Sequence, residues 1–429
     1  MLKSLDLVAS ENKQSPLVRA LHLSSYGEKY YLSNEIFEDK KDSPYPVDEF
    51  FPKLLIAGNK LIAGLFNANW CDPRPLSGTH AMNCLLAGFG DFGDNITITP
   101  EVNSGHFATS YMATRLGLNS SFSLYDKEKY TIDPIKTAEV INTNKPSIVT
   151  LDASHVLFPH PLKELKSYLN YNPLIAYDAS HTMGLIVHKI FQDPFEDGAD
   201  IIHGGTHKTF PGPQKAIFLG KNEEIRQRVD GVIFPRFSSN FHLHHIISLY
   251  GAALEALVFG KSYANQVIKN AQHLGKCMHE AGLPVMAEDH GFTKSHQLWL
   301  NISADKVPLL NEMGIRATVF VIPGTDGQQK GIRLGTQAIT RMGFQEKDMQ
   351  AVAGFIKQGL MDNKNSKLLR NEVSDFVKKF EGISFAFKDI KAIVDAHPVG
   401  GLLAEHMEEG GLDKIFQHLV CAPTFSNQN

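Results

Sequence analysis

Residues 200–215 read DIIHGGTHKTFPGPQK, and they join a short apolar strand to a dense group of titratable and hydroxyl side chains. The strand, Ile201–Ile202, is followed by a glycine pair and then by Thr206, His207 and Lys208. In open α/β sheets, ligands bind beyond the carboxyl ends of the strands. This stretch therefore predicts a strand that ends in a binding site.

The chain around this stretch alternates between strand and helix patterns. Expected strands lie at Asn95–Thr99, Ser147–Leu151, Leu174–Tyr177, Ile201–Ile202 and Ala216–Leu219. Helical spacing of apolar residues lies between them, at Gly105–Leu116 and Pro161–Leu169. This alternation predicts an α/β fold with a mostly parallel sheet. Longer helices are expected at Ile246–Phe259 and Ala264–Ala281, followed by a smaller α+β region over 285–360.

Composition places the chain among ordinary globular proteins, because 43% of its 429 residues are hydrophobic and 21% are charged. A formal net charge of −4 favours neither nucleic acid nor an anionic membrane as a partner. The cysteines (Cys71, Cys84, Cys277 and Cys421) form no C-x-x-C pair, which fits a reducing compartment. No signal peptide or continuous membrane-spanning apolar run is recognisable, so a cytoplasmic location is expected.

Polar residues follow three consecutive expected strands. Asp152 and Ser154 follow the strand that ends at Leu151, and Asp178, Ser180 and His181 follow the next one. His203, Thr206, His207 and Lys208 follow the third. Because parallel strands end at the same edge of a sheet, these side chains are expected to form one site.

A lysine in such a site suits Schiff-base chemistry with a carbonyl group, although most lysines are solvated at the surface. Pyridoxal phosphate requires such an amine, together with a carboxylate for its pyridine nitrogen. Lys208 and Asp178 are candidates for these roles, although an aspartate at a strand end often only caps a helix. Ser77-Gly78-Thr79 precedes a helical run and offers a phosphate site. Arg333 suits a substrate carboxylate or, alternatively, an interdomain ion pair.

Seven short motifs resemble, in order, those of the serine hydroxymethyltransferase family of fold-type I pyridoxal phosphate enzymes. They are ASEN (9–12), SGT (77–79), SGHF (104–107), DASH (152–155 and 178–181), THKTFPGP (206–213) and GIRLGT (331–336). The resemblance implies an aspartate aminotransferase-like fold, with a mostly parallel seven-stranded sheet covered by helices on both faces and a smaller C-terminal α+β domain. It suggests an N-terminal arm (1–40), a cofactor-binding large domain (41–260) and a small domain (261–429).

The resemblance also implies the roles of individual residues. Lys208, Tyr31, His106 and Asp178 are the expected catalytic residues. The expected cofactor site comprises Ser77, Gly78, Thr79, His106, Ser154, Asp178, His181, Thr206, His207, Lys208, Ser239 and Asn240. Ser10, Tyr31 and Arg333 are expected to bind the substrate. The family implies a homodimer with shared sites, in which Ser239 and Asn240 approach the neighbour's cofactor phosphate. Ser10 as a helix N-cap and His106 as an ordinary loop histidine are the simpler alternatives.

Departures from the folate-dependent members favour another branch of this family. Thr318-Val319-Phe320 stands where those members carry a folate-contacting asparagine, and Gln214 stands where they carry an arginine. Three stretches resemble L-threonine transaldolases more than the folate-dependent members: the lysine motif, GFTKSHQ (291–297) and GIRLGTQAITRMG (331–343). Such enzymes cleave threonine to acetaldehyde and add the remaining glycyl unit to a second aldehyde, forming a β-hydroxy-α-amino acid.

The sequence leaves three questions open. Folate-dependent hydroxymethyl transfer and plain threonine or serine aldol cleavage require nearly the same residues, and a silent cofactor-binding scaffold is a further alternative. The base for the β-hydroxyl proton is expected to be Tyr31, with Tyr26 and Tyr30 as alternatives. His242, His244 and His245 resemble metal ligands, but no Cys, Asp or Glu accompanies them at ligand spacing, so no metal site is expected there.

Overall fold

A seven-stranded sheet forms the centre of the part of the chain that the computed structural model describes, residues 3–31, 45, 49–362 and 364–421. The strand order is β2-β10-β9-β8-β7-β3-β4. Strands β4, β3, β7, β8 and β9 run parallel, whereas β10 is antiparallel to both of its neighbours. The strands are β2 (Trp70–Asp72), β3 (Asn95–Ile98), β4 (Asn119–Phe122), β7 (Ile148–Leu151), β8 (Leu174–Asp178), β9 (Ile201–Gly205) and β10 (Ala216–Gly220). The mostly parallel sheet confirms the expected α/β architecture.

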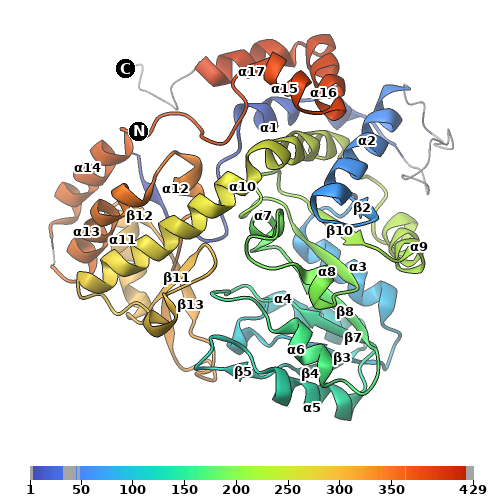
Figure 1. Ribbon diagram of the computed structural model, residues 1–429, viewed down its shortest axis with the longest axis horizontal. Coiled ribbons are helices and arrows are strands. Elements are labelled where there is room, and N and C mark those ends of the chain that lie inside the picture. Colours follow the sequence, from blue (N-terminus) through green and yellow to red (C-terminus); the bar gives the residue numbers. More distant parts are fainter. Residues whose placement is uncertain (1–2, 32–44, 46–48, 363, 422–429) are drawn as a thin grey trace.

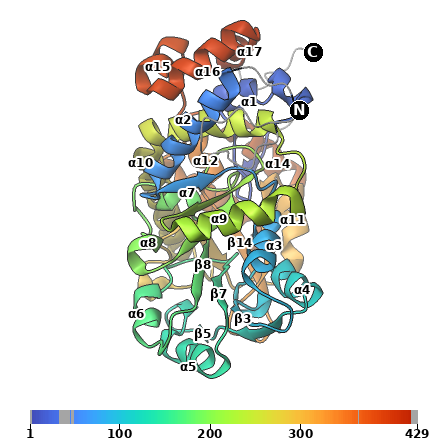
Figure 2. The ribbon, with the colours of Figure 1, turned by 90° about the vertical axis from the view of Figure 1, so that its right-hand side faces the viewer.

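Helices cover both faces of this sheet, as Figure 2 shows. One layer contains α3 (Gly78–Phe89), α4 (Phe107–Arg115) and α9 (Glu223–Val232). The opposite layer contains α5 (Pro134–Asn144), α6 (Leu162–Ser167) and α8 (Pro194–Asp197). Because both faces are covered, every residue of β7, β9 and β10 is buried, which explains why these strands are apolar without alternation.

A second, smaller core adjoins the first through the long helix α10 (Leu243–Glu280), which crosses the molecule diagonally in Figure 1. This core contains the antiparallel sheet β11 (Gln297–Leu300), β14 (Lys330–Gly335) and β13 (Thr318–Val321). Helices α11 (Val307–Glu312), α13 (Met349–Leu360) and α14 (Ser366–Val377) pack around it. Among the described residues, α10 has the length and hydropathy of a membrane-spanning helix, and 72% of its most apolar window is buried inside the fold.

The packing divides the chain differently from the expected domain boundaries. The boundary at residue 260 lies within α10, whose first part joins the large core and whose last turns join the small one. Near the N-terminus, β1 (Leu5–Asp6) pairs with β12 (Ile315–Arg316), whereas α1 (Pro16–Leu21) packs on α10. The C-terminal helices α15 (Ile390–Ala396), α16 (Pro398–Glu409) and α17 (Leu412–Cys421) belong to the large core, where their apolar faces cover α1 and α2 (Phe50–Leu65). Residues 390–421 therefore do not pack with the small domain.

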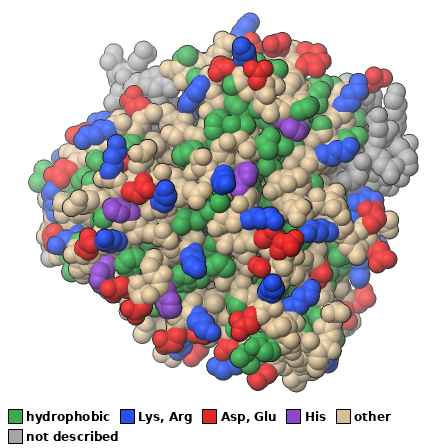
Figure 3. Space-filling model, in the orientation of Figure 1, with side chains coloured by type: hydrophobic (Ala, Val, Ile, Leu, Met, Phe, Trp, Pro, Cys, Tyr) green, Lys and Arg blue, Asp and Glu red, His purple; other side chains and the backbone are tan. Residues whose placement is uncertain are grey.

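Basic and acidic side chains are interspersed over the face shown in Figure 3, in agreement with the small net charge.

In the interior, a buried ion pair links segments that are distant in sequence. Arg341, at the end of α12 (Gln337–Arg341), lies 2.9 Å from Glu255 of α10, and both side chains are 1% exposed. Arg341 also donates hydrogen bonds to the carbonyls of Phe385 (2.5 Å) and Lys13 (3.4 Å). One guanidinium thus connects the N-terminal segment, α10, α12 and the C-terminal region.

Replacing Arg341 with methionine should lower the free energy of unfolding by about 3–5 kcal/mol, because Glu255 then remains as a buried, unpaired charge. Chemical denaturation of the two proteins measures the difference. The double variant Arg341→Met/Glu255→Leu should recover most of the loss, because replacing both partners of a buried pair with apolar residues is often nearly neutral. A double variant as unstable as Arg341→Met would contradict this explanation.

Candidate active site

A cavity of about 220 Å³ lies at the carboxyl ends of β7, β8 and β9. Its lining residues are Ser77, Gly78, Thr79, Met82, His106, Thr109, Asp152, Ala153, Ser154, Asp178, Ser180, His181, Gly205, His207 and Lys208. Polar residues that follow all three strands therefore meet in one place, as the parallel topology predicts, although His203, inside β9, and Thr206 do not line the cavity. The Ser77–Thr79 segment and His106 reach the same cavity from the starts of α3 and α4.

The loop that carries Lys208 is fixed by hydrogen bonds on both sides of the lysine. The Thr206 hydroxyl donates to the Pro213 carbonyl (2.8 Å), and the Thr209 hydroxyl donates to the His181 carbonyl (2.8 Å). The side-chain amide of Asn12 donates to the Lys208 carbonyl itself (2.5 Å). The backbone around Lys208 is thereby held in place while its amine faces the cavity.

Close backbone packing explains the glycine pair before this loop. Gly204 has φ +153°, and a Cβ atom at this position would lie 2.5 Å from the amide nitrogen of Ser180. The neighbouring Gly205 donates its N–H to the Ser180 hydroxyl (2.9 Å). Glycine at position 204 therefore lets the end of β9 approach the loop after β8, which brings Lys208 beside Asp178.

The surroundings of Lys208 lower the pKa of its amine, which makes the amine a better nucleophile near neutral pH. Burial lowers the pKa of Lys208 to about 8, Asp178 opposes this shift and Arg333 adds to it. A lysine with this pKa carries a substantial fraction of neutral amine near neutral pH. Asp178 is oriented by the backbone N–H of Ser180, which donates to Oδ1 at 2.7 Å. The carboxylate thus has a fixed position beside the buried amine.

The first turn of α3 provides a site for an anion. Ser77 is the N-cap, with its Oγ accepting from the N–H of His80 (3.1 Å), and Gly78 and Thr79 begin a twelve-residue helix. The unpaired N–H groups and the dipole of such a helix start favour phosphate. His207 lines the same cavity, and its buried Nδ1 has no hydrogen-bond partner among the described residues. Burial lowers the pKa of His207 to about 4, so the ring is neutral.

His106 and His181 approach the cavity from different sides. His106 caps α4, with its Nδ1 accepting from the N–H of Ala108 (3.3 Å), so it combines a capping role with a position in the cavity. Its ring also stacks on Phe107. The His181 Nδ1 lies 3.2 Å from the side-chain amide of Gln297. Burial lowers the pKa of both histidines.

Arg333 is a buried cation without a protein counter-ion. It lies on β14, is 8% exposed and forms no salt bridge within the described residues. Its guanidinium donates to the Ser154 carbonyl (2.9 Å) and weakly to the Thr318 hydroxyl (3.4 Å). Burial lowers its pKa to about 10. No interdomain ion pair of Arg333 therefore forms among the described residues, and its remaining guanidinium N–H groups beside the cavity suit a substrate carboxylate.

Several predicted site residues do not line the cavity of their own chain. Tyr26 and Tyr31 are buried against Phe51, with ring centroids 5.0 and 5.4 Å away, and Tyr30 stacks on Tyr45. Ser239 and Asn240 lie in the turn before α10, where Asn240 accepts from the N–H of His242. The packing of one chain therefore leaves these residues outside its own cavity.

Thr206 and Ser10 also differ from expectation. The Thr206 hydroxyl is fully buried and is occupied by Pro213, so it stabilises the lysine loop instead of lining the cavity. Ser10 lines a separate groove of about 740 Å³, which shares His207 with the cavity. Ser10 is not a helix N-cap, because α1 begins at Pro16 with Ser15 as its cap.

Two further residues orient the site: Asp152, which was expected there from its place after a strand but was given no role, and Gln297, which sequence reasoning missed. Asp152 is fully buried, accepts hydrogen bonds from the Thr109 hydroxyl (2.6 Å) and the N–H of Thr99 (3.1 Å), and has its pKa raised to about 7 by burial. Gln297 donates to the Ser154 carbonyl (3.1 Å) and contacts His181. The available signal for Gln297 was the polar run TKSHQ immediately before the apolar strand, because such residues are buried only when they have partners.

These residues fit pyridoxal phosphate. Lys208 would hold its aldehyde carbon, Asp178 would pair with its pyridine nitrogen, and Ser77, Gly78, Thr79 and His207 would hold its phosphate. The unpartnered Nδ1 of His207 and the open helix start are the observations that support this fit. The cavity supplies a nucleophile, a carboxylate and an anion site in the combination that this cofactor requires.

Cofactor uptake by the apoenzyme should accelerate as the pH rises, with a midpoint near pH 8, because only the neutral Lys208 amine attacks an aldehyde. Stopped-flow absorbance in the visible range measures the rate. Asp178→Asn should move the midpoint down and Arg333→Gln should move it up, since these charges shift the lysine pKa in opposite directions.

Two variants control this experiment. Lys208→Ala should give no lysine-dependent visible band, whereas Lys221→Ala, which alters an exposed lysine, should leave the midpoint unchanged. A midpoint at the ordinary lysine value of about 10.4 would contradict the assignment.

Comparison with known proteins places this site in a family. Residues 2–356 match the family model described as serine hydroxymethyltransferase. Serine hydroxymethyltransferase from Sulfolobus acidocaldarius is 33% identical over 401 residues, which cover 91% of this chain and 92% of the relative. The enzyme from Thermococcus gammatolerans is 35% identical over 404 residues, with 90% and 93% coverage.

A solved structure of the same type supports the cofactor. The crystal structure of L-threonine transaldolase from Pseudomonas fluorescens in the internal aldimine state is similar with a TM-score of 0.87 and 31% identity, and the similarity covers 95% of this chain and 93% of that one. The expected fold type and pyridoxal phosphate cofactor are thereby confirmed. The chain belongs to the serine hydroxymethyltransferase family of pyridoxal phosphate-dependent enzymes.

Proposed function

We propose that this enzyme is a threonine transaldolase, which cleaves L-threonine to acetaldehyde and adds the glycyl unit to another aldehyde to form a β-hydroxy-α-amino acid. The observation that carries this proposal is the wall beside Arg333. In the folate-dependent members a polar asparagine is expected at this place, whereas here Thr318–Phe320 of β13 occupies it. The similarity to L-threonine transaldolase over nearly the whole chain adds support.

Within this segment Phe320 is the closely packed apolar residue, whereas Val319 is 45% exposed and the Thr318 hydroxyl lies 3.4 Å from Arg333. Phe320 is 3% exposed, with its ring centroid 5.2 Å from that of Trp299 and 5.3 Å from that of His155. Leu157, Ala287 and Ile322 complete the cluster. A buried aromatic wall offers few hydrogen bonds to a pterin, but it suits the hydrocarbon part of an aldehyde.

The loop after Lys208 also departs from the folate-dependent members, at Gln214. Gln214 is exposed and lines the groove of about 740 Å³ that adjoins the cavity at His207. A neutral amide at this position lacks the charge that an arginine would offer to an anionic folate tail. Both departures weaken folate recognition while the groups around Lys208 remain complete.

Residues that line the cavity, together with Arg333 and Gln297 beside it at the Ser154 carbonyl, would each contribute one step to such a reaction. Arg333 would bind the threonine carboxylate, and Lys208 would accept and return a proton at its Nζ. His181 and Gln297 would orient polar groups near Ser154. Pyridoxal phosphate supplies the electron sink for the electron pair that is released when the Cα–Cβ bond breaks. The buried walls would exclude water, which would otherwise protonate the glycyl unit before the second aldehyde arrives.

We further propose a homodimer with shared sites. Tyr31, Ser239 and Asn240 lie outside the cavity of their own chain, so a second copy is the source from which they would complete the site. In that assembly the tyrosine hydroxyl would take the proton of the threonine β-hydroxyl. Amino acids and aldehydes would be the small-molecule partners.

A second candidate is folate-dependent serine hydroxymethyl transfer. The observation in its favour is that curated relatives 33–35% identical over about nine-tenths of this chain carry that name. Threonine or serine aldol cleavage with release of glycine would use the same residues. The three reactions differ in their products and in their need for folate.

The holoenzyme, mixed with L-threonine and an aromatic acceptor aldehyde without folate, should release acetaldehyde and form the β-hydroxy-α-amino acid in equal amounts. A coupled alcohol dehydrogenase assay measures acetaldehyde, and mass spectrometry measures the amino acid. Arg333→Gln should raise the KM for threonine about ten- to a hundred-fold, because hydrogen bonds to charged groups contribute about 1.5–3 kcal/mol.

The products separate the three reactions. Lys208→Ala should abolish turnover and serves as the control for uncatalysed aldehyde chemistry. Glycine and acetaldehyde without the new amino acid would indicate an aldolase. Serine turnover that begins only when tetrahydrofolate is added would overturn the proposal.

A further inference from the structure

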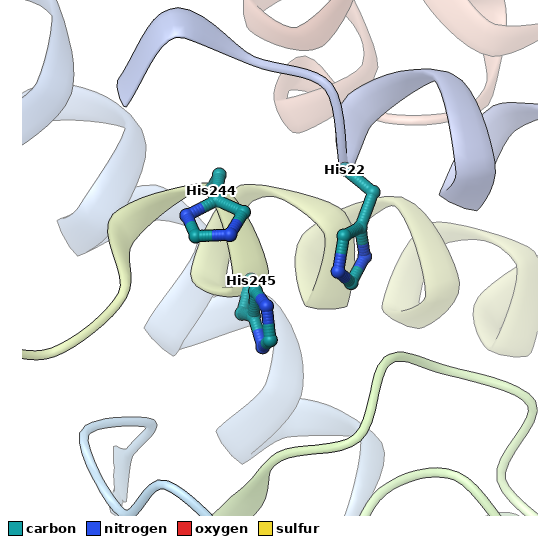
Figure 4. A group of neighbouring side chains, drawn as sticks. All are labelled: His22, His244 and His245. Carbon is teal, nitrogen blue, oxygen red and sulfur yellow. The ribbon is translucent and has the colours of Figure 1, made fainter. Parts of the chain in front are cut away.

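Three histidines from two distant segments meet outside the cavity. They are His22, which ends α1, and His244 and His245 in the first turn of α10 (Figure 4). One ring nitrogen from each lies within 4.8 Å of those of the other two. The local pattern HLHH gave no reason to expect ligands, but it could not include His22, which is more than 200 residues away in the sequence.

The packing of α1 on α10 creates this cluster. The His22 ring lies 4.3 Å from that of His245 and 5.6 Å from that of His244, measured between centroids. The His22 Nδ1 contacts the Ser248 hydroxyl at 3.3 Å, which leaves Nε2 as its free ligand atom. A side chain on Gly27 would approach His244 within 3.2 Å, so glycine at this position leaves room for that ring.

One nitrogen of the cluster is buried and has no partner. The His244 Nδ1 forms no hydrogen bond with the described part of the chain. A buried polar atom without a partner is costly, and in native proteins it often indicates an unseen water or ion. His244 Nδ1 lies against Gly27, however, so the metal site is inferred from the approach of the three rings to one another and not from this atom.

The protonation of the three rings is compatible with metal binding. Burial lowers the pKa of His22, His244 and His245, and in the last of these to about 3, with the neighbouring histidines adding to the shift. Neutral imidazole is the form that binds a metal. The nearby cation is Lys215, whose amine donates to the Phe241 carbonyl (2.8 Å) and whose pKa burial lowers to about 7. Its repulsion of a metal ion is therefore reduced near neutral pH.

We propose that His22, His244 and His245 bind one Zn²⁺ ion, with water as the fourth ligand. Three imidazoles with one open position form a common zinc ligand set, and their nitrogens lie about 2.0–2.1 Å from the metal. Tetrahedral geometry then places the nitrogens about 3.3 Å apart. The rings need to approach one another by small side-chain rotations, which the exposed side of the cluster permits.

A bound zinc ion would link the end of α1 to the first turn of α10. Because His22 precedes the segment with Tyr26, Tyr30 and Tyr31, a metal at this place would hold that segment against the start of the long helix. None of the three histidines lines the cavity with Lys208. The zinc site is thus separate from that cavity, and zinc binding can be measured without assuming the proposed transaldolase reaction.

The test uses tag-free holoenzyme that has been dialysed against a chelator and then titrated with Zn²⁺. Elemental analysis gives the stoichiometry, competition with a chromophoric chelator gives the affinity, and Co²⁺ in place of Zn²⁺ reports the geometry by its visible absorption. We expect one ion per chain. His22→Gln and His245→Gln should weaken binding by at least about a hundredfold, because even loss of a residue that only orients a ligand costs 10–100-fold.

Two control variants distinguish this site from local histidine binding. His418→Ala removes an exposed histidine of α17, and His242→Ala removes the exposed neighbour whose ring lies 5.6 Å from that of His245. Both should keep one tightly bound ion. Zinc binding that His22→Gln leaves intact and His242→Ala abolishes would overturn the proposal, as would wild-type holoenzyme that holds no stoichiometric zinc. The visible absorbance of the bound cofactor checks that each variant is folded.

Discussion

Burial of two cations, Lys208 and Arg333, is the constraint on which the site depends. Removing a charge from water is costly unless a partner compensates for it. Asp178 lies beside the lysine, whereas Arg333 has only the Ser154 carbonyl and the Thr318 hydroxyl within the described structure. The cavity is thus electropositive before any ligand arrives, and anionic ligands complete it. A phosphate at the start of α3 and a carboxylate at Arg333 would both meet this need.

The scaffold explains how these charges remain buried. Lys208 lies in a loop that is held by Asn12 at its own carbonyl and by the hydroxyls of the flanking Thr206 and Thr209. Arg333 lies on the central strand of the small sheet. The two come from different hydrophobic cores, which α10 and the Arg341–Glu255 ion pair hold together. The site therefore forms where the cores meet, and its geometry depends on their packing.

Local patterns predicted much of the cofactor site. Asp178 and Lys208 come at or after the ends of short apolar runs that, in an alternating strand and helix pattern, indicate strands of a parallel sheet, and Ser77 stands where a helix begins. Each of these positions follows from a few neighbouring residues and one rule of sheet topology. Tyr31 and Ser10 were predicted from motif resemblance alone, and Thr206 also from its place after a strand. The structure places them against Phe51, in the adjoining groove and inside the lysine loop, because tertiary contacts determine where such side chains point.

By itself, the sequence determined the α/β class, the edge of the sheet that holds the site and the chemistry of the lysine and its carboxylate. Strand periodicity, glycine positions and residue type are local properties, and they are sufficient for those conclusions. Only the tertiary structure decided that residues 390–421 join the large core, that Arg333 has no counter-ion among the described residues, and that His22 meets His244 and His245. These contacts join segments that are far apart in the chain, and the way helices pack side by side is not encoded in any short stretch.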